Sequence, residues 1–121
     1  MIIYPAILLN PMENRLGGRV FRAAPDEFLK LLEGVKKGEC VLIDVRNPEE
    51  YRAEMIDGAR NVPVSSIVTE LSSLDRDTNL LVYCRAGNRS NRAAEYLKDM
   101  GFSNITVLDG GIKALKTYLR R

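Results

Sequence analysis

Residues 80–90 read Leu-Leu-Val-Tyr-Cys-Arg-Ala-Gly-Asn-Arg-Ser, and this stretch decides the fold class. Its first four residues form an apolar run, which is typical of a strand buried on both faces, as in a parallel sheet. Glycine and asparagine then interrupt the pattern, and helical spacing of apolar residues begins at Ser90. The stretch therefore predicts a buried strand, a short loop that starts at Cys84 and a helix that begins at Ser90.

The same alternation of strands and helices extends in both directions along the chain. Apolar runs predict buried strands at residues 41–45 and 105–108 and a short strand at 59–62. Helical periodicity, capping residues and turn glycines predict helices over 26–35, 48–53, 66–74, 90–100 and 111–119. This order predicts an α/β fold in three layers, with a central, mostly parallel sheet and helices on both faces.

The chain is expected to consist of an N-terminal extension, residues 1–21, and one domain over 22–121. No helical or strand period runs through residues 1–20. The apolar run at the N-terminus is too short to span a membrane and lacks the features of a signal peptide. With only two cysteines, the protein is expected to be cytoplasmic, away from membranes, with both thiols free.

The overall composition excludes several classes of function. The chain has 121 residues and a net charge of +2, which is too small to predict nucleic acid as a partner. It contains no histidine, which excludes Cys/His and Ser/His catalysis, and we expect no metal and no cofactor. Positive charge is concentrated locally, because the stretch between Asp77 and Glu95 contains no acidic residue. Its arginines are Arg85, Arg89 and Arg92.

Cys84 is the candidate nucleophile. It follows a strand of the predicted sheet, and parallel sheets bind ligands beyond the carboxyl ends of their strands. Loop amides, the helix N-terminus and the flanking Arg85 and Arg89 favour negative charge there, and the thiolate is the reactive form of cysteine. Gly87 and Asn88 tolerate the positive φ angles that such a loop requires. The alternative, a buried structural cysteine, gives no role to two neighbouring cations.

Four motifs, in order, resemble those of the rhodanese-type sulfurtransferase domain from about residue 22 to the C-terminus. They are Ile43-Asp44-Val45-Arg46 with Pro48-Glu49-Glu50-Tyr51, Gly58-Ala59-Arg60-Asn61-Val62-Pro63, Cys84-Arg85-Ala86-Gly87-Asn88-Arg89-Ser90 and Leu108-Asp109-Gly110-Gly111. The resemblance implies a single-domain, rhodanese-like three-layer fold. It also implies that Cys84 takes a sulfane sulfur from a donor such as thiosulfate, becomes a persulfide and passes the sulfur to a thiophilic acceptor, such as cyanide, a thiol or a protein.

The resemblance and the local charges together suggest a role for each loop residue. Cys84 is expected to be catalytic, and the residues expected to bind the donor are Arg85, Ala86, Gly87, Asn88, Arg89 and Ser90. Arg85 and Arg89 are expected to hold the sulfonate oxygens of thiosulfate through charge-assisted hydrogen bonds. No proton needs to move if Cys84 begins as a thiolate, so the lack of histidine is no obstacle.

Two other functions compete with sulfur transfer by turnover. Related phosphatases and arsenate reductases carry Cys-x₅-Arg, whereas four residues separate Cys84 from Arg89 here and Ser90 stands at the longer spacing. The shorter loop favours sulfur over phosphate, because a phosphoryl group would lose part of its cradle. The second alternative is a carrier or protein-docking module without turnover, with the N-terminal extension as a docking or dimerisation arm. The sequence leaves the oligomeric state open.

Other polar and glycine positions have structural interpretations. Asp44 and Arg46 are expected to pair at a strand end, because buried charges need partners. Gly110-Gly111 is interpreted as the tight entry to the last helix. Cys40, at the start of a strand, is expected to be structural.

The chain also departs from the resemblance at two positions. Met55 stands where many members have a histidine, and Leu115 lies in the region where many have a tryptophan. Both are interpreted as packing positions. The basic residues near the C-terminus suit a helix end and are expected to need no ligand. They are Lys113, Lys116, Arg120 and Arg121.

Overall fold

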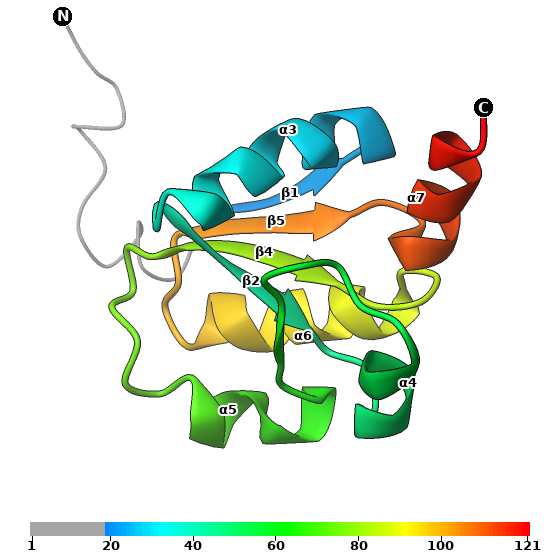
Figure 1. The fold of residues 1–121 in the computed structure, drawn as a ribbon. Coiled ribbons are helices and arrows are strands. Elements are labelled where there is room, and N and C mark those ends of the chain that lie inside the picture. The colour runs from blue at the N-terminus through cyan, green and yellow to red at the C-terminus, as the bar shows by residue number, and fades with distance from the viewer. Residues whose placement is uncertain (1–18) are drawn as a thin grey trace, which may run out of the picture.

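The computed structural model describes residues 19–121, which form a five-stranded sheet with helices on both faces (Figure 1). The helices and strands follow one another along the chain as the sequence predicts, and the α/β class is confirmed. In chain order they are β1 (Arg19–Ala23), α3 (Pro25–Lys36), β2 (Cys40–Asp44), α4 (Pro48–Ala53), β3 (Arg60–Asn61), the 3₁₀ helix η1 (Val64–Ser66), α5 (Ile67–Glu70), β4 (Asn79–Tyr83), α6 (Asn88–Asp99), β5 (Asn104–Leu108) and α7 (Gly111–Leu119).

The sheet has the strand order β1-β5-β4-β2-β3, and every pairing is parallel. The strand that precedes Cys84 is the middle one: Val82 is in register with Ile43 of β2 on one side and with Val107 of β5 on the other. Because all strands run in one direction, their carboxyl ends share one edge of the sheet. That edge therefore brings together the loops that follow β2, β4 and β5.

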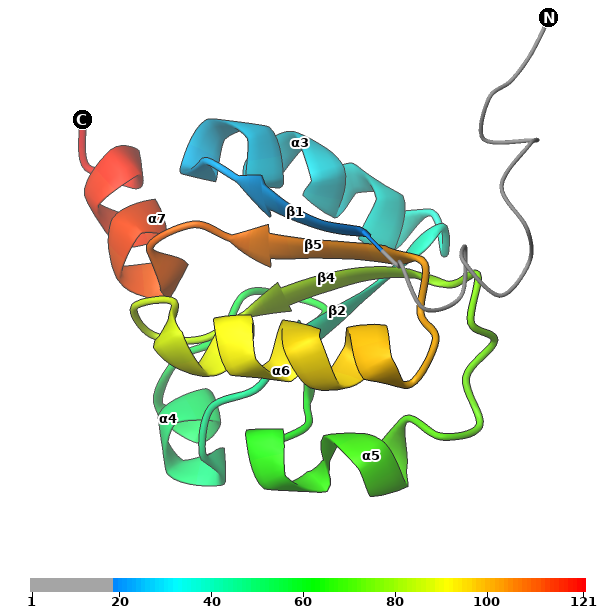
Figure 2. The same cartoon turned by 180° about the vertical axis from the view of Figure 1, so that it is seen from behind.

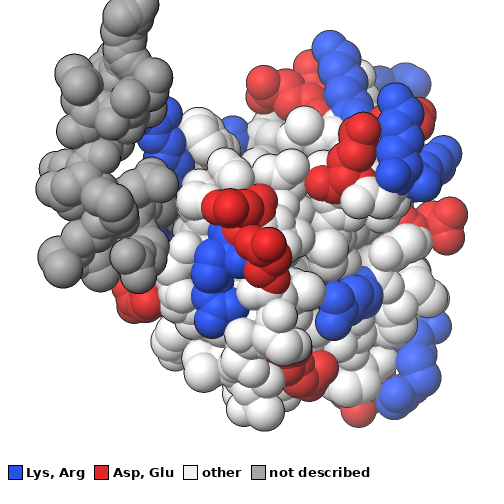
Figure 3. Space-filling model, turned by 90° about the vertical axis from the view of Figure 1, so that its left-hand side faces the viewer, with Lys and Arg blue, Asp and Glu red and all other residues white. Residues whose placement is uncertain are grey.

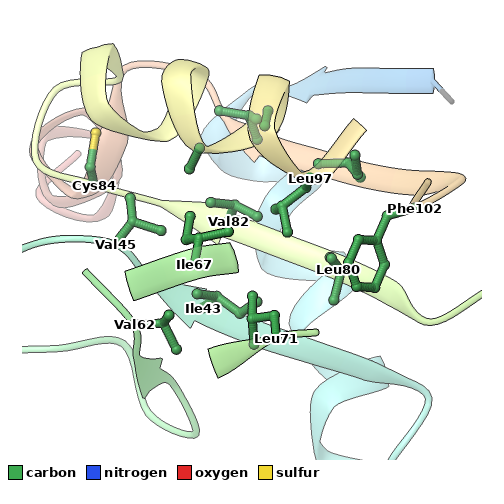
Figure 4. Packing of buried hydrophobic residues seen from close by; sticks show 14 residues of the cluster. Ile43, Val45, Val62, Ile67, Leu71, Leu80, Val82, Cys84, Leu97 and Phe102 are labelled. Atoms are coloured by element: carbon green, nitrogen blue, oxygen red, sulfur yellow. The ribbon is translucent and has the colours of Figure 1, made fainter. Parts of the chain in front are cut away.

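Helices α3 and α7 cover one face of the sheet, and α5 and α6 cover the other (Figures 1 and 2). One core lies under α5 and α6 and includes the fully buried Ile67, Leu97 and Phe102 (Figure 4). The second core, under α3 and α7, includes Phe28 and Leu115. With a core on each side, the central strands bury both faces, which explains their continuous apolar runs.

The structure differs from the predicted bounds of three elements, each for a local reason. β1 begins at Arg19, where the sequence predicts no strand, because a mostly exposed edge strand lacks an apolar signature. The helix expected to reach residue 74 ends at Glu70, where the Ser72 hydroxyl donates to the Thr69 carbonyl, a bond that favours turns. The rest of the expected extension lies outside the described residues.

The third difference concerns the helix after the cysteine loop, which begins two residues earlier than expected. Gly87 adopts the left-handed φ of 113° and caps α6 directly, so that Asn88 is already helical. Glycine has no Cβ and takes this conformation without strain. The loop between Cys84 and the helix is therefore only three residues long, which brings the first N–H groups of α6 close to the cysteine.

The charged surface is mixed at the amino-terminal edge of the sheet, where acidic and basic side chains are interspersed (Figure 3). No helix within residues 19–121 is long and apolar enough to cross a membrane. Both cysteines are free thiols, as expected: Cys40 is half-buried and Cys84 is buried.

Candidate active site

Cys84 lies directly after the central strand, with its sulfur turned toward the first turn of α6 (Figure 4). The residue is 1% exposed. The hydrogen bonds between β2 and β4 continue up to Tyr83, the residue before Cys84, because the Val45 N–H donates to the Tyr83 carbonyl at 3.0 Å. The sulfur therefore directly follows the middle strand of the sheet and is shielded from bulk water.

Two backbone amides point at the sulfur. The N–H of Gly87 donates to Cys84 Sγ at 3.1 Å, and the N–H of Ser90 donates at 3.2 Å. Both belong to the N-terminal turn of α6, where the partial positive charge of the helix dipole adds to the field of the amides. N–H groups in this geometry stabilise negative charge that develops on the sulfur of Cys84 or on an atom bound to it.

Ser90 adds a hydroxyl that can respond to the charge on the sulfur. The side chain is completely buried, accepts from the Cys84 thiol at 3.3 Å and donates to the Gly87 carbonyl at 3.0 Å. When the thiol loses its proton, the hydroxyl can rotate and donate to the sulfur instead. Ser90 therefore serves both states of the cysteine.

The remaining loop residues divide into exposed and paired groups. Arg85, Ala86 and Asn88 are exposed, and Arg85 forms no ion pair with a carboxylate among the described residues. Arg89 is different, because Glu50 of α4 binds its guanidinium with both carboxylate oxygens, at 2.6 and 3.0 Å. Of the two arginines that the sequence predicts to hold an anion, Arg89 is thus already paired with a carboxylate, while Arg85 has no such partner among the described residues.

Glu50 is the residue whose importance only the structure reveals. The hydrogen bonds from Arg89 lower the pKa of its carboxyl to about 2, although partial burial opposes the shift. The same carboxylate raises the pKa of Arg89. Glu50 Oε1 also accepts from the N–H of Asn47 as the cap of α4, the one role that the sequence predicts for it. Its second role, tying α4 to the first turn of α6, joins residues 39 positions apart.

Asp44 and Arg46 form the buried pair that their positions predict. The guanidinium of Arg46 donates to both oxygens of Asp44, with the shortest contact, to Oδ2, at 2.7 Å, and also to the Glu54 carbonyl at 2.7 Å. The side chain of Arg46 is 4% exposed and that of Asp44 is 0% exposed. The hydrogen bond that Arg46 donates to Asp44 is the main reason that the pKa of Arg46 is raised. The pair holds the loop after β2 in place beside the cysteine loop.

Gly110-Gly111 does more than open the last helix. The N–H of Ile112 donates to the Cys84 carbonyl at 2.9 Å, and that of Lys113 donates to the Arg85 carbonyl at 3.0 Å. Gly111 has a φ of 68°, and a Cβ on it would lie 2.6 Å from Ala86 N and closer still to the Arg85 carbonyl. The N-terminus of α7 therefore packs against the backbone of the cysteine loop, and only glycine at position 111 permits this contact.

Residues 24–118 match the rhodanese-like domain family over most of the chain. The chain belongs to this family. A thiosulfate sulfurtransferase GlpE from Pseudomonas putida is 38% identical over 92 residues, 76% of this chain and 81% of that protein.

Solved structures agree with this assignment. A rhodanese-related protein from Thermoplasma volcanium superposes with a TM-score of 0.68 at 30% identity, covering 81% of this chain and 92% of that one. The rhodanese-like domain of an Anabaena protein gives a TM-score of 0.72 at 26% identity, covering 80% of this chain and 74% of that one. The resemblance of the sequence motifs is thus confirmed at the level of family and fold.

The two departures from the family pattern occupy different surroundings in this rhodanese-like domain. Leu115 is 4% exposed and packs in the core beneath α3 and α7, as expected for a packing position. Met55 is 45% exposed and lies after α4, so the prediction that it packs is wrong. Its neighbour Ile56 is the residue that turns into the core.

Proposed function

We propose that this rhodanese-like domain transfers a sulfane sulfur from thiosulfate to a thiophilic acceptor through a persulfide on Cys84. The observation that carries the proposal is the pair of amides, from Gly87 and Ser90, that point at the sulfur. A persulfide keeps a negative charge on the loop, and preorganised N–H groups stabilise such charge at little cost in reorganisation. The sulfurtransferase activity in the name of the Pseudomonas relative supports the same chemistry.

The first half-reaction needs no general base. The Cys84 thiolate attacks the outer sulfur of thiosulfate, the new S–S bond forms, and the bond to the sulfonate sulfur breaks. Sulfite leaves with the electron pair of that bond. The acceptor nucleophile then attacks the outer sulfur of the persulfide, and Cys84 leaves as a thiolate again, so the cycle balances without an oxidant. A chain without histidine can perform it.

Arg85 is proposed to hold the sulfonate of the donor. It is exposed, it follows Cys84 directly, and no carboxylate among the described residues pairs with it. Arg89 acts as a positioning residue, because its charge is already engaged by Glu50. The proposed setting is the cytoplasm, where a reducing environment keeps both cysteines free.

The direct test is the intact mass of the protein. Incubation with thiosulfate is expected to add one sulfur atom, and cyanide is expected to remove it with release of thiocyanate. Peptide mapping should locate the added sulfur on Cys84 and not on Cys40. A protein that gains no sulfur from thiosulfate, or gains it on Cys40, would contradict the proposal. Loading without turnover would identify a carrier module instead.

Arg85→Ala is expected to lower kcat/KM for thiosulfate by roughly ten- to a hundredfold, the range for loss of one hydrogen bond to a charged group. The value of kcat/KM for an uncharged polysulfide donor should fall by less than about threefold, because this donor has no sulfonate to bind. Arg92→Ala is the matched control, since Arg92 is an exposed arginine of α6, close to Arg85 in sequence. Equal losses for the two donors would show that Arg85 does not bind the anion.

A further inference from the structure

A cavity of about 430 Å³ lies beside the cysteine loop, between the end of α4 and one side of α7. Arg85, the residue after the candidate nucleophile, lines it. Ile112, whose N–H donates to the Cys84 carbonyl, also lines it. The volume lies within the range of sites for small organic ligands. It exceeds what thiosulfate, an anion of five atoms, can fill.

One side of the cavity is a polar stripe on α7. Lys113, Lys116 and Thr117 of α7 and its C-cap Arg120 all line the cavity, and their spacing of three and four residues places them on one face of the helix. The sequence interprets these basic residues as a favourable helix end only. The structure instead turns them toward a cavity next to the active-site loop.

The cavity holds a surplus of positive charge. Both carboxylates that line it are engaged, Glu50 by Arg89 and Glu54 by Lys116, and Arg46 is paired with Asp44. Three further cations that line it form no ion pair with a carboxylate among the described residues. They are Arg85, Lys113 and Arg120.

A ligand for this cavity must therefore be larger than thiosulfate and must carry more than one negative charge to match its cations. It must also present a reactive group to Cys84, since the cavity adjoins that loop. A small thiol that carries carboxylates meets all three requirements. Cyanide has only two atoms and would leave Lys113 and Arg120 without a partner.

We propose that this cavity binds the acceptor of the second half-reaction, and that the acceptor is a low-molecular-weight thiol with two or more carboxylates. The proposal rests on the proposed function. Its thiolate attacks the outer sulfur of the Cys84 persulfide, a new S–S bond forms on the acceptor, and Cys84 leaves as a thiolate. Lys113 and Arg120 hold the carboxylates, so they determine acceptor specificity and take no part in loading the cysteine.

The test begins with protein already loaded with sulfur, so that failure to load would count against the proposed function alone. Loss of the added sulfur is followed by intact mass in a single turnover with two probes, mercaptosuccinate, a dicarboxylate, and 2-mercaptoethanol, which is uncharged. Lys113→Ala/Arg120→Ala should lower the apparent second-order rate constant for mercaptosuccinate by roughly tenfold, the sum expected for two exposed ion pairs. The rate constant for 2-mercaptoethanol should change by less than about twofold.

The matched control is Lys30→Ala/Lys36→Ala, which removes the same charge from exposed positions of α3. It should leave both rate constants within about twofold of the wild-type values, since exposed charges distant from a site contribute little. High salt should slow mercaptosuccinate and not 2-mercaptoethanol in the wild-type protein. Equal effects on both thiols, or an equal effect of the control, would overturn the proposal.

Discussion

Cys84→Ser is expected to lower thiocyanate production from thiosulfate and cyanide by at least about a thousandfold, the scale at which loss of a nucleophile is felt. The serine hydroxyl would accept hydrogen bonds from the same N–H groups of Gly87 and Ser90. A serine hydroxyl is not ionised at neutral pH, however, and it forms no persulfide. The substitution is close in volume, so the free energy of unfolding should change little. Initial rates and urea denaturation of the same samples measure both quantities.

Cys40→Ser is the control for this experiment. Cys40 begins β2 at the edge of the sheet opposite to the cysteine loop. Burial, aided by the neighbouring Glu39 carboxylate, raises the pKa of the Cys40 thiol, which keeps it in the unreactive protonated form. The variant should retain the wild-type rate within about twofold. Substantial activity in Cys84→Ser, or loss of activity in Cys40→Ser, would show that Cys84 is not the thiol that carries the chemistry.

Gly111→Ala is expected to lower the free energy of unfolding by about 2–5 kcal/mol, which combines left-handed strain with overpacking. Its Cβ would collide with the backbone of Arg85 and Ala86, which cannot move without displacing the loop that carries Cys84. We therefore expect kcat/KM for thiosulfate to fall by more than about tenfold in protein that is still folded, because the amides around the sulfur lose their alignment. Urea denaturation and steady-state kinetics well below the melting temperature separate the two effects.

Gly38→Ala separates strain from collision. Gly38 has a φ of 76°, close to the 68° of Gly111, but a Cβ on it would meet nothing within 4 Å. It precedes β2, at the opposite edge of the sheet from Cys84. This variant should lose only about 1 kcal/mol and keep its activity. Equal losses of stability and activity in the two glycine variants would show that the contact between α7 and the cysteine loop is not the reason for glycine at position 111.

Much of this fold follows from local patterns. The apolar runs of β2, β4 and β5 identify strands buried on both faces, and helix caps such as Asn47 with Glu50 identify the helix starts. The edge strand β1 escapes prediction because only Ala23, its last residue, is buried. An edge strand has one neighbour and less burial, so its sequence carries a weaker signal.

The active site divides in the same way. Cys84, its amides and the start of α6 lie within seven consecutive residues, so their sequence alone predicts a thiol at a helix N-terminus. The pairing of Glu50 with Arg89 could not be predicted, because it links two helices from distant parts of the chain. This pairing is the basis for proposing that Arg89 positions the loop, whereas the sequence predicts that it binds the donor. Arg85, by contrast, forms no ion pair with a carboxylate among the described residues.

The sequence by itself determined the candidate nucleophile Cys84, the turn that leads from it into α6 and the buried parallel strand before it, because these depend on neighbours along the chain. Only the tertiary structure decided which charges remain free, since ion pairs form between segments that folding brings together. It also turned one face of α7 toward the cavity beside Cys84 and packed Gly111 against the cysteine loop. Both depend on where the last helix docks, and docking depends on cores that the whole chain builds.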